Sequence, residues 1–211
     1  MKKIFTLIAV AAMAMSVNAQ RLTFTEDLKT SYDVEGFKLD IVDTNSKLSI
    51  DKTKETNFGT ADAYEKIAGL LKTGGKSSSN NNMTLTIPAD GTLKVYVRTG
   101  SNSATDRTLV LTQGENELYN KVVQEADAVK SGESTIYPVI SVSVKIGSVS
   151  VAYPVGSLNF TAFELVKGTA GLNNVKAVEA ENGAAYNLAG QKVADDFKGV
   201  VIKNGKKMIQ K

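Results

Sequence analysis

The chain has 211 residues, of which 42% are hydrophobic, enough for one globular domain with a core and a small appendage. It contains no cysteine, histidine or tryptophan, which excludes disulfides, thiolate nucleophiles, serine–histidine–aspartate triads and metals held by cysteine or histidine. The formal net charge is +3, but residues 20–171 carry 16 basic and 18 acidic side chains, so this part lacks the basic footprint of a nucleic-acid-binding protein.

Residues 1–19 have the pattern of a secretory signal peptide. Two lysines follow the first methionine, residues 4–15 are apolar, and Val17 and Ala19 place small residues at positions −3 and −1 of a cleavage site. The apolar run is too short to span about 30 Å of hydrocarbon comfortably. We therefore expect cleavage before Gln20 and an exported chain without a transmembrane segment.

The first predicted strands are residues 21–25, 37–42 and 48–50, where apolar and polar residues alternate. The turn between the second and third is surrounded by oxygen-bearing side chains, namely those of Asp40, Asp43, Asn45 and Asp51. They could hold calcium, but their spacing matches no EF-hand loop, and Asp and Asn are ordinary turn formers. We expect a turn here and no cofactor, with calcium as the alternative.

Residues 62–72 are ambiguous. Four apolar residues recur at helical spacing, and Asp62 with Glu65 would make a capping box. Periodicity alone therefore favours a short helix that ends at the two glycines of positions 74 and 75.

The central part of the chain alternates with a period of two, and turn residues separate the segments. The predicted strands are 83–87, 93–98, 109–111, 139–146, 149–151 and 160–166. This pattern predicts an all-β fold, a jelly-roll-like β-sandwich over residues 20–167. The expected core consists of Leu85, Ile87, Leu93, Val95, Val97, Leu109, Leu111, Ile140, Val142, Val144, Val149, Val151, Phe160 and Leu165.

Roughly residues 58–165 resemble a known protein family. The resemblance rests on Leu71-Lys72-Thr73-Gly74-Gly75, the strand 83–87, Gly91-Thr92-Leu93-Lys94-Val95-Tyr96-Val97 and Thr99-Gly100-Ser101. This order resembles the β-sandwich accessory module found beside catalytic domains in bacterial pectate lyases and related secreted polysaccharide-degrading proteins. The resemblance implies a carbohydrate-binding-like module, because the chain has no room for the catalytic β-helix. It also implies an extended conformation at 71–75, against the helix.

The candidate binding surface lies on the strand and loop from position 96 to 107. Its residues are Tyr96, Arg98, Asn102, Asp106 and Arg107. Two guanidinium groups beside a loop rich in hydroxyls and amides suit an acidic, pectin-like sugar, because the planar fork meets a carboxylate bidentately. Tyr96, Tyr119 or Tyr137 could offer a ring face to a sugar. The alternative is that Tyr96 and Arg98 simply lie on the polar, solvent-facing side of a strand.

An acidic patch at Glu125, Asp127 and Glu133 is the nearest approach to a catalytic site. Glycosidases need a carboxylate pair, but the sequence places no partner at the required separation, and acidic residues in loops are usually solvated. We predict no catalytic residue.

Residues 168–171, Gly-Thr-Ala-Gly, predict a flexible linker, and residues 172–211 a small β-rich C-terminal unit. Its motif residues are Tyr186, Leu188, Gly190, Gly199, Gly205, Lys206 and Lys207. Asn-Gly at positions 204 and 205 predicts a hairpin turn. The pattern resembles the C-terminal sorting domain that Bacteroidetes append to cargo of the type IX secretion system. The resemblance implies recognition by that secretion machinery; a plain β-hairpin is the alternative.

The sequence thus predicts an exported, non-catalytic module that binds a polysaccharide and is delivered to the surface or medium of a Gram-negative bacterium. The alternative is a surface-structural or adhesive protein that contacts other proteins.

Overall fold

The computed structural model describes residues 19–168, 185–187, 190–194, 197–203 and 206–210. These residues are built from β-strands and one 3₁₀ turn, η1 (Glu125–Asp127), and they fall into two compact units that divide after residue 169. None of the described segments is a helix long and apolar enough to cross a membrane. The signal segment before Ala19 and linker residues 169–171 lie outside the described residues.

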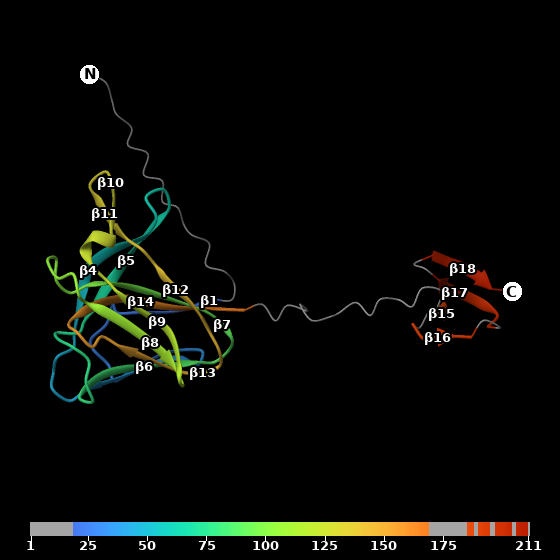
Figure 1. The fold of residues 1–211 in the computed structure, drawn as a ribbon, viewed down its shortest axis with the longest axis horizontal. Helices are drawn as coiled ribbons and strands as arrows, with labels where there is room; N and C mark the ends of the chain where they lie inside the picture. Colours follow the sequence, from blue (N-terminus) through green and yellow to red (C-terminus); the bar gives the residue numbers. More distant parts are fainter. Residues whose placement is uncertain (1–18, 169–184, 188–189, 195–196, 204–205, 211) are drawn as a thin grey trace, which may run out of the picture. The chain divides into compact units, whose positions relative to one another are not determined.

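The first unit is a β-sandwich of two sheets (Figure 1). The larger sheet has, in spatial order, β10 (Val129–Ser131), β11 (Ser134–Tyr137), β4 (Ser49–Gly59), β5 (Tyr64–Lys72), β14 (Leu158–Lys167), β7 (Gly91–Thr99) and β12 (Ile140–Val144), with β1 (Ala19–Thr23) also paired to β14. The smaller sheet has the order β2 (Ser31–Val34), β3 (Phe37–Asp43), β6 (Asn81–Ile87), β13 (Gly147–Ala152), β8 (Thr108–Gln113) and β9 (Asn116–Val122).

The core between the two sheets follows the period-two pattern of the sequence. Every segment predicted as a strand falls on a strand. Most ends are displaced by a few residues, but the segment predicted at 48–50 is only the start of the longer strand β4. Twelve of the fourteen predicted core residues are buried in one cluster, and Ile140 and Val142 pack against it half-buried. Phe24, Phe160 and Phe163 add ring contacts, since burial of aromatic side chains contributes a large apolar area. The all-β sandwich is confirmed.

The larger sheet curls over its outer side. Phe58 of β4 meets Tyr96 of β7 edge to face, with 5.5 Å between ring centroids, although β5 and β14 separate their strands. In a flat sheet, three strand spacings would hold these rings about 14 Å apart. Ile67, Tyr137 and Ala162 join them in a second, smaller core. Strand β11 pairs with β4 and the next strand, β12, pairs with β7, so this stretch of chain connects the two sides of the curl.

The helix expected at 62–72 is wrong, because these residues form β5, paired with β4 and β14. The apolar spacing that mimics a helix comes from burial on both faces. Ile67 lies in the second core and Leu71 in the main core. Between them, Gly69 has a φ of +89°, which shifts the strand's alternation. The extended conformation implied at 71–75 by the family resemblance holds for Leu71 and Lys72.

The second unit is a four-stranded sheet of order β16 (Lys192–Val193), β15 (Ala185–Asn187), β17 (Gly199–Lys203) and β18 (Lys206–Gln210). Strands β17 and β18 are antiparallel, and Lys203 lies opposite Lys206. This register fits a two-residue hairpin connection. The Asn-Gly pair itself lies outside the described residues. Ala185 and Val201 are buried in this unit.

Candidate functional site

Three polar side chains form a row across adjacent strands on the outer side of the larger sheet. Arg98 of β7 lies opposite Asn159 of β14, and Asn159 lies opposite Lys72 of β5. Directly opposite residues share one face of a sheet, with Cβ atoms about 5 Å apart. Leu158 and Phe160, on either side of Asn159, point into the main core, so the row points away from it. We call Arg98, Asn159 and Lys72 the polar row.

Arg98 lies beside the second core. Its guanidinium carbon is 5.9 Å from the ring centroid of Tyr137, and Nη1 donates to the carbonyl of Thr99 at 3.4 Å. A cation over an aromatic ring is attracted by the ring's electron-rich face. Within the part of the chain that the structure describes, Arg98 has no carboxylate within ion-pair distance. Its charge is therefore positioned by the protein without a direct ion pair among the described residues.

Tyr137 is itself fixed beneath this arginine. Its hydroxyl donates to both carboxylate oxygens of Glu125, at 2.8 and 3.0 Å. Burial, followed by the hydrogen bond to Glu125, raises the pKa of Tyr137 to about 12, so the phenol stays a neutral donor. One member of the predicted acidic patch therefore positions a tyrosine.

Asn159 and Lys72 complete the row. Asn159 is 8% exposed, and its amide makes no hydrogen bond to any other described residue. Buried amides usually have partners, so this one is available to a ligand or to water. Lys72 donates to Asp51 at 2.9 Å, and both side chains are partly exposed. An unpaired guanidinium next to an unpaired amide can accept a carboxylate and a neighbouring hydroxyl.

Tyr96 is predicted as a binding residue, with a solvent-facing position as the alternative, and the structure buries it instead. Its residue is 2% exposed, with its ring against Phe58 and the guanidinium of Arg21 4.9 Å from its centroid. The alternation correctly places Tyr96 on the outer side of the sheet. The curl then covers that side, so the ring is not open to a sugar.

A charged cluster surrounds the hydroxyl of Tyr96. Arg21 donates to Glu65 at 2.7 and 2.9 Å, to Glu164 at 2.6 Å and to Tyr96 at 2.9 Å, while Lys94 donates to Glu164 at 2.9 Å. Burial opposes ionisation of Glu164, but Lys94 and Arg21 outweigh it and hold its pKa below the ordinary value. These groups satisfy one another, so we assign the cluster to stability.

The loop residues of the predicted site lie in different surroundings. Asn102 and Asp106 are exposed. Arg107 packs against Gly156, donates to the carbonyl of Val155 at 3.4 Å and lies 3.8 Å from Asp106. A Cβ at Gly156 would overlap this guanidinium, at 1.4 Å from Nη1. Arg98 and Arg107 therefore contact different residues of the protein. Binding by the loop residues stays a prediction.

Tyr119 and the possible calcium ligands contact other residues of the protein itself. Tyr119 is half-buried on β9 against the main core. The carboxylate of Asp43 accepts from the backbone amides of Lys47 at 2.8 Å and Leu48 at 3.1 Å, which makes it a turn former. Asp40 pairs with Lys38, and Asp51 with Lys72. No group of three acidic side chains that could hold a metal occurs among the described residues.

The described motif residues of the C-terminal unit occupy strands and turns. Tyr186 is half-buried on β15, opposite Ile202. Gly190 has a φ of +78° and donates its amide to the carbonyl of Asn187 at 3.0 Å, closing the turn before β16. Gly199 begins β17, and Lys206 and Lys207 are exposed at the start of β18. Leu188 and Gly205 lie outside the described residues.

Sequence reasoning missed Asn159 and Lys72 as site residues. Asn159 carries one usable signal, a polar residue between two core positions of the last strand. Its alignment with Arg98 and Lys72 depends on the pairing of three strands that are distant in sequence, which periodicity does not reveal.

Comparisons with known proteins give remote likenesses only. No protein-family model matches the chain, and no curated protein matches it. Among solved structures, it is similar to a chain described with glycan recognition in the Ruminococcus flavefaciens cellulosome (TM-score 0.38, 13% identity, 71% of this chain and 93% of that one). It is also similar to the C-terminal CBM6 of the marine laminarinase LamC from Zobellia galactanivorans (TM-score 0.32, 12% identity, 61% and 99%). A third is the CBM22-1–GH10 pair of Clostridium thermocellum xylanase 10B with xylohexaose (TM-score 0.32, 13% identity, 71% and 28%). Likenesses at these scores place the chain in none of those families.

Proposed function

We propose that the sandwich is a non-catalytic module that binds a polysaccharide bearing carboxylate groups, and that the polar row is its binding surface. The observation that carries this proposal is the state of Arg98. Lys94 and Arg21 on the same side of the sheet have carboxylate partners, whereas Arg98 has none among the described residues. A guanidinium held in place and left unpaired suits bidentate binding of a uronate carboxylate.

The neighbours of Arg98 add selectivity for a sugar. The amide of Asn159 offers donors and an acceptor to a hydroxyl on the same ring, and the Lys72 ammonium offers a second, weaker cation to the next residue along the polymer. Tyr137 holds the guanidinium in place, because its own hydroxyl is bound to the carboxylate of Glu125. Such a surface can bind a sugar polymer. It contains no free carboxylate pair for hydrolysis.

The experiment is calorimetric titration of the full purified chain with polygalacturonate and with neutral galactan. We expect binding to polygalacturonate, weakened about tenfold or more by Arg98→Ala, because charge-assisted hydrogen bonds contribute about 1.5–3 kcal/mol. Arg98→Lys should recover only part of the affinity, since it keeps the charge but not the fork. Lys121→Ala, on exposed β9 of the other sheet, is the matched control. Equal affinity of wild type and Arg98→Ala would refute the proposal.

We also propose that the chain is exported through its N-terminal signal and sorted to the cell surface by residues 172–211. The support is the sequence pattern at the two ends of the chain. In a Bacteroidetes host, a chain lacking residues 172–211 should accumulate in the periplasm. Unchanged surface display of that truncated chain, measured by protease accessibility on whole cells, would contradict the proposal.

A further inference from the structure

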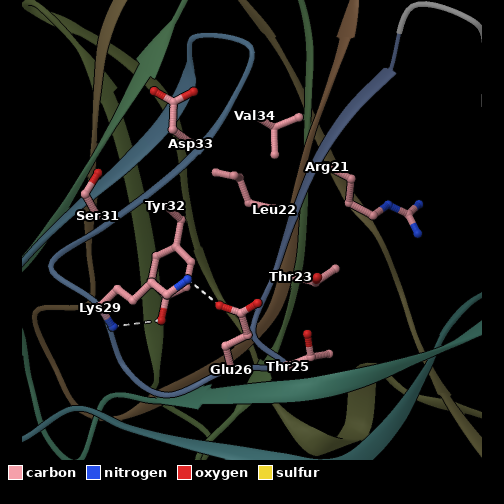
Figure 2. Close-up of a pocket in the computed structure, with 10 residues that line it drawn as sticks. All are labelled: Arg21, Leu22, Thr23, Thr25, Glu26, Lys29, Ser31, Tyr32, Asp33 and Val34. Carbon is pink, nitrogen blue, oxygen red and sulfur yellow. Dashed lines mark hydrogen bonds and ion pairs between the residues drawn. The ribbon is translucent and has the colours of Figure 1, made fainter.

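A pocket of about 240 Å³ lies at the side of the sandwich, where the edges of the two sheets meet (Figure 2). On one side is β1, which pairs with β14, and on the other is β2, which pairs with β3. No strand pairing joins β1 to β2 in the described chain, so the two edges enclose a space instead of a ladder. This space is large enough to hold several water molecules or a small ring-shaped ligand.

The walls of the pocket are held by the protein's own contacts. The hydroxyl of Tyr32 accepts from the backbone amide of Lys29 at 3.1 Å and donates to the carbonyl of Asp27 at 3.3 Å. Its ring meets Phe24 edge to face, with 5.4 Å between centroids. The loop from β1 to β2 is thereby fixed to the main core. A pocket with fixed walls loses little conformational entropy when a ligand binds.

The charges that line the pocket cancel and already have partners. Lys29 pairs with Glu26, and one carboxylate oxygen of Asp33 accepts from the amide of Gly36 at 2.9 Å. Arg21 is bound to the cluster around Tyr96, and Figure 2 shows its guanidinium turned away from the other labelled side chains. The lining therefore offers no unpaired cation to a carboxylate.

Hydroxyl groups remain available in this pocket. Thr23, Thr25 and Ser31 are among the residues that line it, and their hydroxyls make no hydrogen bond to any other described residue. Val34, which is 36% exposed, supplies apolar surface beside them, whereas Leu22 is buried in the main core. Hydroxyls that both donate and accept, next to apolar carbon, match the alternating hydroxyl and C–H surface of a neutral sugar.

We propose that this pocket binds one neutral sugar residue, as a second saccharide site separate from the polar row. The two sites differ in chemistry, because the row presents an unpaired cation and the pocket presents hydroxyls with no net charge. The inference goes beyond the binding of an acidic polymer at Arg98 and stands without it. On a mixed polysaccharide, the pocket would take a neutral residue or side branch.

The test is an NMR titration of the full isotope-labelled chain with D-galactose, D-glucose, D-xylose, D-mannose and, for comparison, D-galacturonate. At least one neutral sugar should cause saturable amide shifts within residues 22–26 and 31–34. Thr25→Val, which removes one hydroxyl at an exposed position, should weaken that binding about two- to tenfold, the range expected for one neutral hydrogen bond. Thr23→Val should do the same, and Thr86→Val, at an exposed position on β6 away from both proposed sites, is the matched control.

Each outcome tests the pocket separately from the polar row. Neutral-sugar shifts that persist in Arg98→Ala support the pocket whether or not polygalacturonate binds. If no neutral sugar shifts these residues in the wild-type chain, the pocket proposal is overturned, and binding of polygalacturonate at Arg98 is unaffected by that result. Shifts of equal affinity in the wild type, Thr23→Val and Thr25→Val would also overturn it, because the hydroxyls would then play no part.

Discussion

Two arginines on the outer side of the larger sheet have opposite surroundings. Arg21 donates to two glutamates and a tyrosine, and burial is outweighed by these partners, so its pKa is raised. Arg98 interacts with the side chain of Tyr137 and the carbonyl of Thr99 and has no carboxylate partner among the described residues. The first arginine stabilises the curl, since removing one member of a buried ion pair leaves an uncompensated charge. The second is the arginine for which we propose a binding role.

Glu164 should make stability depend on pH. Its folded-state pKa is lowered, so its contribution is fully present above the unfolded-state pKa of about 4.3 and is lost as the pH falls through the lowered value. At neutral pH we expect Glu164→Gln to lower the free energy of unfolding by about 3 kcal/mol. The difference from wild type should narrow below about pH 4, as measured by urea denaturation.

Glu55→Gln is the control for that series, because Glu55 and its partner Lys66 are both more than half exposed, at 55% and 58%. Exposed ion pairs contribute about 0–1 kcal/mol. A gap between wild type and Glu164→Gln that stays constant from about pH 7 to about pH 3 would contradict the assignment.

At the scale of single elements, strand β5 decides how the larger sheet curls. The chain bends at Gly69, where a Cβ would lie 2.3 Å from the carbonyl oxygen of Phe24. Before this bend β5 carries Ile67 into the second core, and after it Leu71 into the main one. The same strand supplies Lys72 to the polar row.

Gly69→Ala should therefore be strongly destabilising. A positive φ of +89° costs about 1–3 kcal/mol for a side chain that is not glycine, and the overlap with Phe24 adds to it. We expect a lower urea midpoint and weaker protection of the second core. Gly75→Ala is the control, because a Cβ there meets no atom within 4 Å. Equal midpoints for the two variants would show that β5 tolerates a different bend.

The sequence predicted much of the sandwich because half-buried strands have a local period of two. Twelve of the fourteen chosen core residues are buried in the main cluster. Prediction from the sequence failed at β5 and at Tyr96 for the same physical reason. The curl buries the outer side of the larger sheet, and strands that are buried on both faces lose their alternation of apolar and polar residues. The sequence selected Arg98 as a candidate by residue type, and the binding role of Arg98 stays a proposal. It could not identify Asn159, because that role depends on a register between distant strands.

For the whole molecule, the two units differ in their cores. The sandwich buries more than twenty hydrophobic residues in one cluster, whereas the described part of the C-terminal unit buries only Ala185 and Val201. Small units with little buried apolar area are marginally stable. The hydrophobic residues Met208 and Ile209 of β18 are 44% and 72% exposed.

Native-state hydrogen exchange should reveal this difference. We expect the amides of β17 to exchange much faster than the paired amides of β6 and β13, because local opening of the small unit exposes little apolar surface. Mass spectrometry of peptic fragments from the full chain measures both in one sample. Equal protection of β17 and β13 would contradict the expectation.

The most direct test of the central claim is NMR titration of the isotope-labelled chain with trigalacturonate, observing the Nε–H signal of Arg98 and the side-chain amide of Asn159. The account predicts saturable shifts of both signals with one affinity, and loss of the Asn159 shift in Arg98→Ala. The side-chain signal of Arg107 serves as the internal reference. If the Arg98 and Asn159 signals do not move while others do, the acidic-sugar site lies elsewhere. If none moves, the sandwich does not bind this class of polysaccharide.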